Sequence, residues 1–145
     1  MLIEPVYSRI TGVWTTVIAR KVTGANGEFI GAIGRGIESA NFEKFFATAA
    51  LGPDSAIAIH HRDGTLLARH PHIPEIIGKN FRRGPAVQQR VFEQPATTTR
   101  LTSPLDGKDR LISSRALTGF PMVIVASTTT EAARSPTGAS RSRCW

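Results

Sequence analysis

All four histidines of the chain lie close together, at positions 60, 61, 70 and 72. Imidazole nitrogens bind zinc and other metals, so this cluster is the first candidate for chemistry. The dipeptide Asp63-Gly64 between two apolar runs predicts a two-residue hairpin turn, which pairs Ala58 with Arg69. Because successive side chains of a strand point to opposite faces, His60 and His61 then diverge. We therefore expect no metal site and no cofactor here, and we interpret the histidines as exposed or hydrogen-bonded side chains.

Two arginines of the predicted strands, Arg69 and Arg115, share a strand face with apolar side chains. A guanidinium on such a face is costly to bury unless it is paired or meets an anion. Its planar donors match a carboxylate, so either arginine is a candidate contact for a carboxylate-bearing ligand. Two alternatives stay open: each arginine pairs with Asp109, Glu75 or a backbone carbonyl, or its charged end extends to water.

The sequence lacks the motifs of the common hydrolases and nucleotide-binding enzymes. It contains no Gly-x-Ser-x-Gly elbow, no His-Glu-x-x-His and no phosphate-binding loop. Asp63 and Asp106 each precede a glycine, where a carboxylate caps its own turn. We therefore predict that the chain is not an enzyme.

The net charge of +7 and the isoelectric point near 10.8 raise the question of nucleic-acid binding. The basic residues are spread along the chain, and the densest group of them has only Phe81 and Phe92 as nearby aromatic residues. Single-strand binders instead interleave aromatic and basic side chains. We expect no nucleic-acid partner, and a basic surface that faces solvent or a membrane.

The length of 145 residues fits one ordinary domain. No segment approaches the roughly 18–20 apolar residues that cross a bilayer. Met1–Tyr7 lacks the basic and apolar regions of a secretory signal, so we expect a soluble piece with no signal peptide. The single cysteine, Cys144, excludes an internal disulfide and leaves the compartment open.

Three dipeptides, Asn26-Gly27, Asp63-Gly64 and Asp106-Gly107, organise the predicted strands, because Asx-Gly pairs adopt the positive φ of tight hairpin turns. After the first hairpin, phenylalanines recur at helical spacing and predict an amphipathic helix over Asn41–Leu51, with Ser39 as its N-cap. An irregular crossover and a meander of three strands follow the second hairpin. The predicted strands are Trp14–Val22, Phe29–Ile37, Ser55–His61, Thr65–His70, Thr97–Thr102, Arg110–Leu117 and Met122–Ser127, the last apolar enough to be central.

This order of elements, together with three segments, resembles a known sensor domain. GPDSAIAIHHRDGTLLARHP (Gly52–Pro71), followed by Ile77-Gly78, is similar to the membrane-proximal half of a double Cache domain. This is the PAS-like extracytoplasmic sensor of bacterial diguanylate cyclases and histidine kinases. SPLDGKDRLISSRALTGFPMVIVAS (Ser103–Ser127) is similar to the closing strands of the same half. The segment Ile10–Phe46 is similar to the last two strands of the membrane-distal half and the helix that follows them.

The resemblance implies an α+β fold: a PAS-like Cache module with an antiparallel sheet of about five strands and a packed helix, preceded by an extra β-hairpin. It divides the chain into three parts. Residues 1–38 are expected to be a remnant hairpin of the membrane-distal module, residues 39–130 the membrane-proximal module, and residues 131–145 a disordered tail.

The resemblance also implies a function. The expected role is a ligand-sensing extracytoplasmic domain, or a truncated fragment of one, from a transmembrane receptor such as a diguanylate cyclase or histidine kinase. The parent protein would be membrane-anchored, with this part in the periplasm. A pocket between the sheet and its covering segments would bind a small molecule, a carboxylate or another anion, and we predict Arg69, Ser113 and Arg115 as its lining. A homodimer is a further expectation. The alternative is a structural or dimerisation module that binds no ligand.

Overall fold

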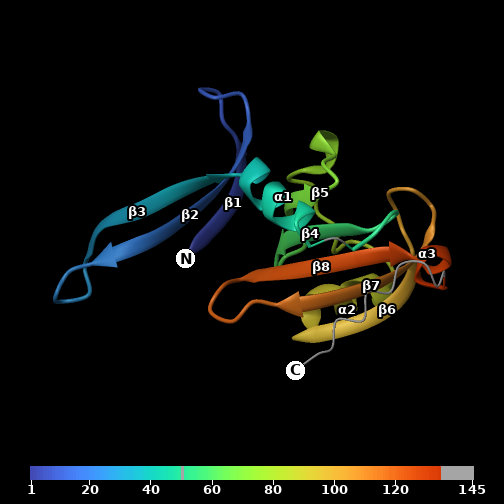
Figure 1. The fold of residues 1–145 in the computed structure, drawn as a ribbon. Helices are drawn as coiled ribbons and strands as arrows, with labels where there is room; N and C mark the ends of the chain where they lie inside the picture. The colour runs from blue at the N-terminus through green and yellow to red at the C-terminus, as the bar shows by residue number, and fades with distance from the viewer. Residues whose placement is uncertain (50, 135–145) are drawn as a thin grey trace.

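A computed structural model describes residues 1–49 and 51–134 and contains two antiparallel sheets (Figure 1). The smaller sheet has the order β1-β2-β3 and projects from the rest of the molecule. Its strands are β1 (Leu2–Tyr7), β2 (Trp14–Thr23) and β3 (Phe29–Glu38). The sequence predicted only the β2–β3 hairpin here. Strand β1 was not predicted; it contains Pro5, which is tolerated there because β1 is an edge strand.

The larger sheet has five strands in the order β5-β4-β8-β7-β6. All neighbours are antiparallel, and the chain's last strand lies in the centre, as its apolar sequence predicted. The strands are β4 (Ala56–His61), β5 (Leu66–His70), β6 (Ala96–Thr102), β7 (Asp109–Ala116) and β8 (Met122–Thr129). The expected α+β fold with an antiparallel sheet of about five strands is therefore confirmed.

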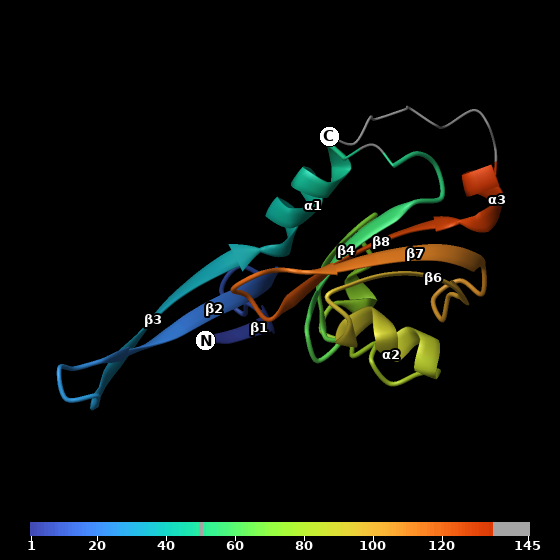
Figure 2. The same cartoon turned by 90° about the horizontal axis from the view of Figure 1, so that it is seen from below.

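Helices cover the two faces of the five-stranded sheet (Figure 2). Helix α1 (Ser39–Ala47) packs on one face against β5, and α2 (Ala86–Glu93) packs on the other against β6 and β7. A short 3-10 helix, η1 (Pro74–Ile76), lies in the crossover before α2, and α3 (Thr130–Arg134) follows β8. Within the described residues, we find no helix with the length and hydrophobicity to cross a membrane.

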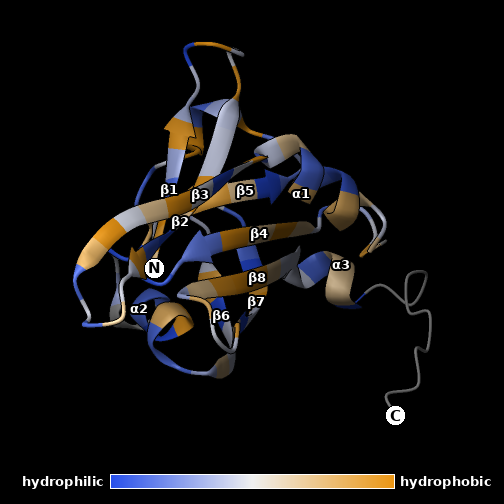
Figure 3. Ribbon diagram, turned by 90° about the vertical axis from the view of Figure 1, so that its left-hand side faces the viewer, coloured by the Kyte–Doolittle hydropathy of each residue, from blue (hydrophilic) through white to orange (hydrophobic). Residues whose placement is uncertain are grey.

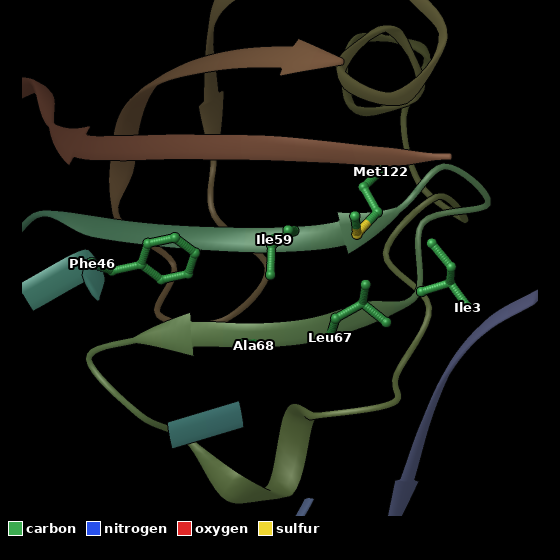
Figure 4. Close-up of a cluster of buried hydrophobic side chains, with 6 residues drawn as sticks. All are labelled: Ile3, Phe46, Ile59, Leu67, Ala68 and Met122. Carbon is green, nitrogen blue, oxygen red and sulfur yellow. The ribbon is translucent and has the colours of Figure 1, made fainter. Parts of the chain in front are cut away.

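The main hydrophobic core lies between α1 and the sheet (Figure 4). The predicted aromatic stripe contributes Phe46, which is buried, and Phe42, which stacks on it at 6.5 Å, whereas Phe45 is exposed. Ser39 is not the N-cap. It is the first residue of α1, and its buried hydroxyl donates to the carbonyl of Leu67 at 3.1 Å, which ties α1 to β5. The buried members of this core are Ile3, Phe46, Ile59, Leu67, Ala68 and Met122.

The β4–β5 hairpin has a longer turn than predicted. His61 N–H donates to Thr65 O at 2.8 Å, so the loop holds three residues, and Gly64 takes a φ of 99°. A bulge between Ile59 and His60 then restores the register, and Ala58 pairs with Arg69 as predicted. The extra loop residue and the bulge cancel, which is why the pairing farther from the turn could be predicted correctly.

The outer part of the three-stranded sheet carries apolar side chains that nothing in the described chain covers (Figure 3). Phe29, Ile30 and Ile33 of the edge strand β3 are each more than 60 % exposed. At the other end of the chain, α3 extends to Arg134, so the tail predicted as disordered from Glu131 begins as helix. The rest of that predicted tail, residues 135–145, lies outside the described residues.

Candidate functional site

A cavity of about 110 Å³ lies between the five-stranded sheet and α2, on the face opposite α1. Strand β4 alternates alanine with isoleucine: Ala56 and Ala58 face the cavity, whereas Ile57 and Ile59 pack toward α1. The small alanine side chains leave open space that a leucine or isoleucine would fill. The apolar wall is completed by Leu66, Ile76, Phe81, Val91, Phe92, Leu101, Ile112 and Val125.

One end of the cavity is built around Arg110, the first inward-facing residue of β7. Its side chain is only 10 % exposed. Nε and Nη2 donate to Asp106 Oδ2 at 3.1 and 2.6 Å, and Nη1 donates to the carbonyl of Asp54 at 2.8 Å. These hydrogen bonds from Arg110 hold the pKa of the Asp106 carboxyl well below its usual range, so Asp106 is an anion at any physiological pH.

Arg69 lines the same cavity from β5, opposite Ala58. Its side chain is half-buried, and Nη1 donates to the carbonyl of Pro71. Burial, followed by repulsion from Arg110, lowers the pKa of Arg69 from its ordinary value. The guanidinium groups of Arg69 and Arg110 are therefore balanced by one carboxylate, that of Asp106, and this part of the cavity carries excess positive charge.

His60 lies toward the other end. In the sheet register His60 pairs with Val123 and Arg110 with Thr129, about 20 Å apart along β8 at ~3.3 Å per residue. The imidazole is 7 % exposed and meets Phe81 and Phe92 edge-on, with ring centroids 5.7 and 5.2 Å away. Burial lowers the pKa of His60 to about 4, so the ring is neutral at pH 7. This end of the cavity is aromatic and uncharged.

Of the three predicted ligand contacts, the structure places Arg69 at the cavity and Ser113 and Arg115 elsewhere. Ser113 and Arg115 are exposed on the opposite face of β7, and Ser113 Oγ lies 3.1 Å from Thr98 Oγ1. Neither lines the cavity, so their ligand contact stays a prediction. The inward residues of β7 are Arg110, Ile112 and Ser114, one position out of phase with the face that was predicted.

Sequence reasoning missed Arg110, His60 and Asp106 as cavity residues. Because β7 has apolar residues on both faces, such as Leu111 and Ile112, the sequence alone did not show which face of the strand points inward. Asp106 was interpreted only as a turn residue. The spacing of four positions between Asp106 and Arg110, at the β6–β7 turn, is the sequence feature that could have indicated their ion pair. Asp109, one of the alternative partners expected for Arg69 or Arg115, instead pairs with Arg100.

The other histidines diverge from His60. His61 lies 3.1 Å from the Asp63 carboxylate, and His72 Nδ1 lies 2.5 Å from Glu43 Oε1 at α1. Within residues 1–49 and 51–134, no three His, Cys, Asp or Glu side chains are grouped in a way that could hold a metal ion.

Comparison with solved structures finds the same fold in bacterial sensor domains. The extracellular domain of rpHK1S-Z16, a protein described as a histidine kinase, aligns with a TM-score of 0.74 and 29 % identity over 93 % of this chain and 56 % of its own. The periplasmic sensory domain of the Campylobacter jejuni chemoreceptor Tlp1 aligns with a TM-score of 0.71 and 12 % identity over 92 % of this chain and 50 % of its own.

A third structure is the ligand-binding domain of the Pseudomonas fluorescens chemoreceptor CtaA in complex with L-serine. It aligns with a TM-score of 0.61 and 20 % identity over 88 % of this chain and 54 % of its own. The chain thus spans about half the length of the solved structures that it matches. No curated protein matches it.

The sequence model of one protein family matches residues 39–127, which include α1, α2, the whole cavity lining and all of the five-stranded sheet except the last two residues of β8. That family is described as a histidine kinase sensor domain of the dCache_1-like type. Its solved structural relatives are extracellular or periplasmic sensor domains of histidine kinases and chemoreceptors. The chain belongs to the dCache_1-like family of histidine kinase sensor domains.

Proposed function

We propose that this domain senses a small anionic molecule and that the ligand binds in the cavity between the five-stranded sheet and α2. The observation that carries the proposal is the charge of the cavity: Arg69 and Arg110 face one carboxylate, that of Asp106, and the rest of the lining is uncharged and mostly apolar. A ligand carboxylate would balance the excess positive charge, and the apolar wall would cover the rest of the molecule.

Arg69 is the proposed anchor. Arg110 already donates to Asp106 and Asp54 through all three of its guanidinium nitrogens. Among the described residues, Arg69 donates only one hydrogen bond, from Nη1 to the carbonyl of Pro71. Its other N–H groups can therefore donate to a ligand carboxylate. Half-burial also favours an anion beside Arg69, because the guanidinium has lost part of its water there.

In this proposal the domain is not catalytic, and ligand binding acts by changing the relative populations of two conformations of the domain. A ligand that binds one conformation more tightly shifts the equilibrium toward it by no more than its difference in affinity. The parent protein would be a membrane-anchored receptor, a histidine kinase or a diguanylate cyclase, with this domain on the periplasmic side. The extracellular and periplasmic placement of its relatives supports this location.

We further propose that residues 1–38 are the end of a membrane-distal module and residues 39–130 the membrane-proximal module. Two observations support the division. The family match begins at residue 39, at the start of α1, and this chain covers only 56 % of the rpHK1S-Z16 domain and 50 % of the Tlp1 domain. The remaining strands of such a distal module would cover the apolar side chains of β3.

The test is a thermal-shift screen of the chain against acetate, propionate, butyrate, amino acids and inorganic anions, with wild type and Arg69→Ala. A ligand at about 100 times its Kd adds roughly 2.7 kcal/mol of stability, which raises the Tm visibly. We expect an anion to raise the Tm of wild type and to lose most of that effect in Arg69→Ala. Arg69→Lys, which keeps the charge but not the planar donors, is the second variant should Arg69→Ala fold poorly.

Two matched variants locate the site. Arg90→Ala removes the same charge from an exposed position of α2 and is expected to keep the full ligand shift. Arg115→Ala tests the face of β7 that the sequence pointed to. Loss of the shift in Arg115→Ala but not in Arg69→Ala would move the site to that outer face, and no shift with any anion would contradict the proposed function.

One observation favours the alternative of a dimerisation module without a ligand. Strand β3 is a sheet edge and exposes Phe29, Ile30 and Ile33. Such an edge can pair with a second copy of the chain. A stable dimer whose Tm responds to no small molecule would support this alternative over sensing.

A further inference from the structure

We propose that the cavity selects a short aliphatic monocarboxylate and rejects both α-amino acids and dicarboxylates. This inference rests on the proposed function and narrows its ligand class. It follows from the positions of the charged side chains along the cavity and from which of them are already paired.

Among the described residues, the cavity offers an ammonium group no free carboxylate, only neutral acceptors on Gln88, Ser103 and Ser127. Asp106 is the one acidic residue among the described residues that line it. Both of its oxygens lie near Arg110, with contacts to Nε at 3.4 and 3.1 Å and to Nη2 at 2.6 Å. An α-amino acid anchored by its carboxylate at Arg69 would hold its ammonium beside two guanidinium groups, without a free anion to balance it.

The cavity also offers no partner for a second carboxylate. Beyond Ala58, the wall toward the other end includes Leu66, Phe81 and Phe92 around His60, and the neutral amide of Gln88, which donates to the carbonyl of Phe81. The imidazole is neutral there because burial lowers the pKa of His60 to about 4. A second anionic group would lose its water among aromatic rings and gain no cation in return.

The size of the space limits the hydrocarbon part of the ligand. At about 110 Å³ the cavity is well below the roughly 300–1,000 Å³ of sites for drug-sized ligands. Its walls between Arg69 and His60 are aliphatic or aromatic, so an unbranched chain of a few carbons is the body that they fit. A carboxylate at Arg69 with such a chain toward His60 satisfies both ends.

The experiment is calorimetric titration of wild type with four molecules on one carbon skeleton: butyrate, 2-aminobutyrate, succinate and butylamine. We expect butyrate to bind, and 2-aminobutyrate and succinate to bind roughly tenfold more weakly or worse, because each carries a charge that the site leaves unpaired. Butylamine should not bind. Equal or tighter binding of 2-aminobutyrate would overturn the inference and leave the proposed function intact, whereas no binding by any anion would remove both.

A gain-of-function variant gives an independent readout. Ser127 on β8 lines the cavity, and Ser127→Asp would add the anion that an ammonium lacks. We expect this variant to raise the affinity for 2-aminobutyrate relative to that for butyrate by about tenfold. The neutral control Ser127→Asn should keep the wild-type preference. An unchanged preference in a folded Ser127→Asp protein would overturn the charge argument.

Discussion

At the scale of single residues, the candidate site depends on three groups whose neighbours fix their charge. Arg110 is held by Asp106 and Asp54, Arg69 keeps free donors, and His60 is neutral because it is buried between two phenylalanines. Arg110 donates from all three guanidinium nitrogens and shapes the cavity, whereas Arg69 donates to a described residue from Nη1 alone and can bind a ligand through its other nitrogens. Arg110 and Arg69 are the same residue type and differ in how many of their N–H donors already have a partner in the protein.

His60 predicts how stability depends on pH. Its folded pKa of about 4 lies below the unfolded value near 6.5, so the unfolded state binds more protons between these two values. Stability should therefore fall as the pH drops from about 6.5 to 4, by as much as about 3 kcal/mol from this one group. The measurement is the free energy of unfolding in urea at several pH values, for wild type and His60→Gln.

We expect the loss between pH 6.5 and 4 to be smaller in His60→Gln, because glutamine does not titrate. The depressed pKa of Asp106 acts in the same direction but at lower pH, since stability from a lowered carboxyl pKa is lost only as the pH falls below its unfolded value near 3.8. An identical pH profile for both proteins would show that His60 is not buried as a neutral ring.

At the scale of elements, the β4–β5 hairpin positions two of the cavity residues, His60 and Arg69. Its three-residue loop needs Gly64, both for the φ of 99° and because an added Cβ would lie 2.6 Å from the backbone nitrogen of Arg82. Arg82 belongs to the crossover that supplies Phe81 to the cavity. The turn thus fixes the hairpin and the crossover against each other.

Two of the three Asx-Gly turns, those at Gly27 and Gly64, allow a matched pair of glycine substitutions. Gly64→Ala adds a steric clash to an unfavourable φ and should cost several kcal/mol of stability. Gly27→Ala has a similar φ of 81° but no atom within 4 Å of the added Cβ, so it should cost about 1 kcal/mol. Chemical denaturation of both variants checks this, and equal losses would mean that the contact with Arg82 is unimportant.

At the scale of the whole molecule, one compact module carries the cavity, and a second sheet projects from it (Figure 1). The apolar side chains of Phe29, Ile30 and Ile33 on that sheet are exposed. Ile3 of β1 enters the main core, so the two parts are joined by more than the chain. The outer end of the small sheet has no such contact among the described residues. That asymmetry is expected of part of a longer structure or of a surface that meets another copy.

The exposed strand β3 therefore predicts self-association of the isolated chain. Ile33 is 68 % exposed on this edge strand. We expect the mass from light scattering to rise with protein concentration in wild type and to rise less in Ile33→Lys, with an unchanged Tm, because Ile33 makes no core contact. Arg35→Ala, on the same strand, is the control. A wild-type chain that stays monomeric at all concentrations would contradict this prediction.

The local sequence determined the elements and much of their pairing. Asx-Gly turns and alternating apolar residues located the hairpins, the aromatic spacing located α1, and the apolar run of β8 placed it in the centre of the sheet. These features depend on a few neighbouring residues and on the fixed periods of helix and strand, so they can be predicted from a single sequence. The pairing of Ala58 with Arg69 followed from the same rules.

Only the tertiary structure decided which face of each strand meets the cavity. Strand β7 carries apolar residues on both faces, so its period could not tell Arg110 from Arg115, and packing of α2 against β6 and β7 made the choice. The meeting of Arg69 with Arg110 and Asp106 joins segments about 40 residues apart, and the neutrality of His60 depends on Phe81 and Phe92. Charge, burial and partners at the site arise from long-range contacts, which local sequence patterns do not specify.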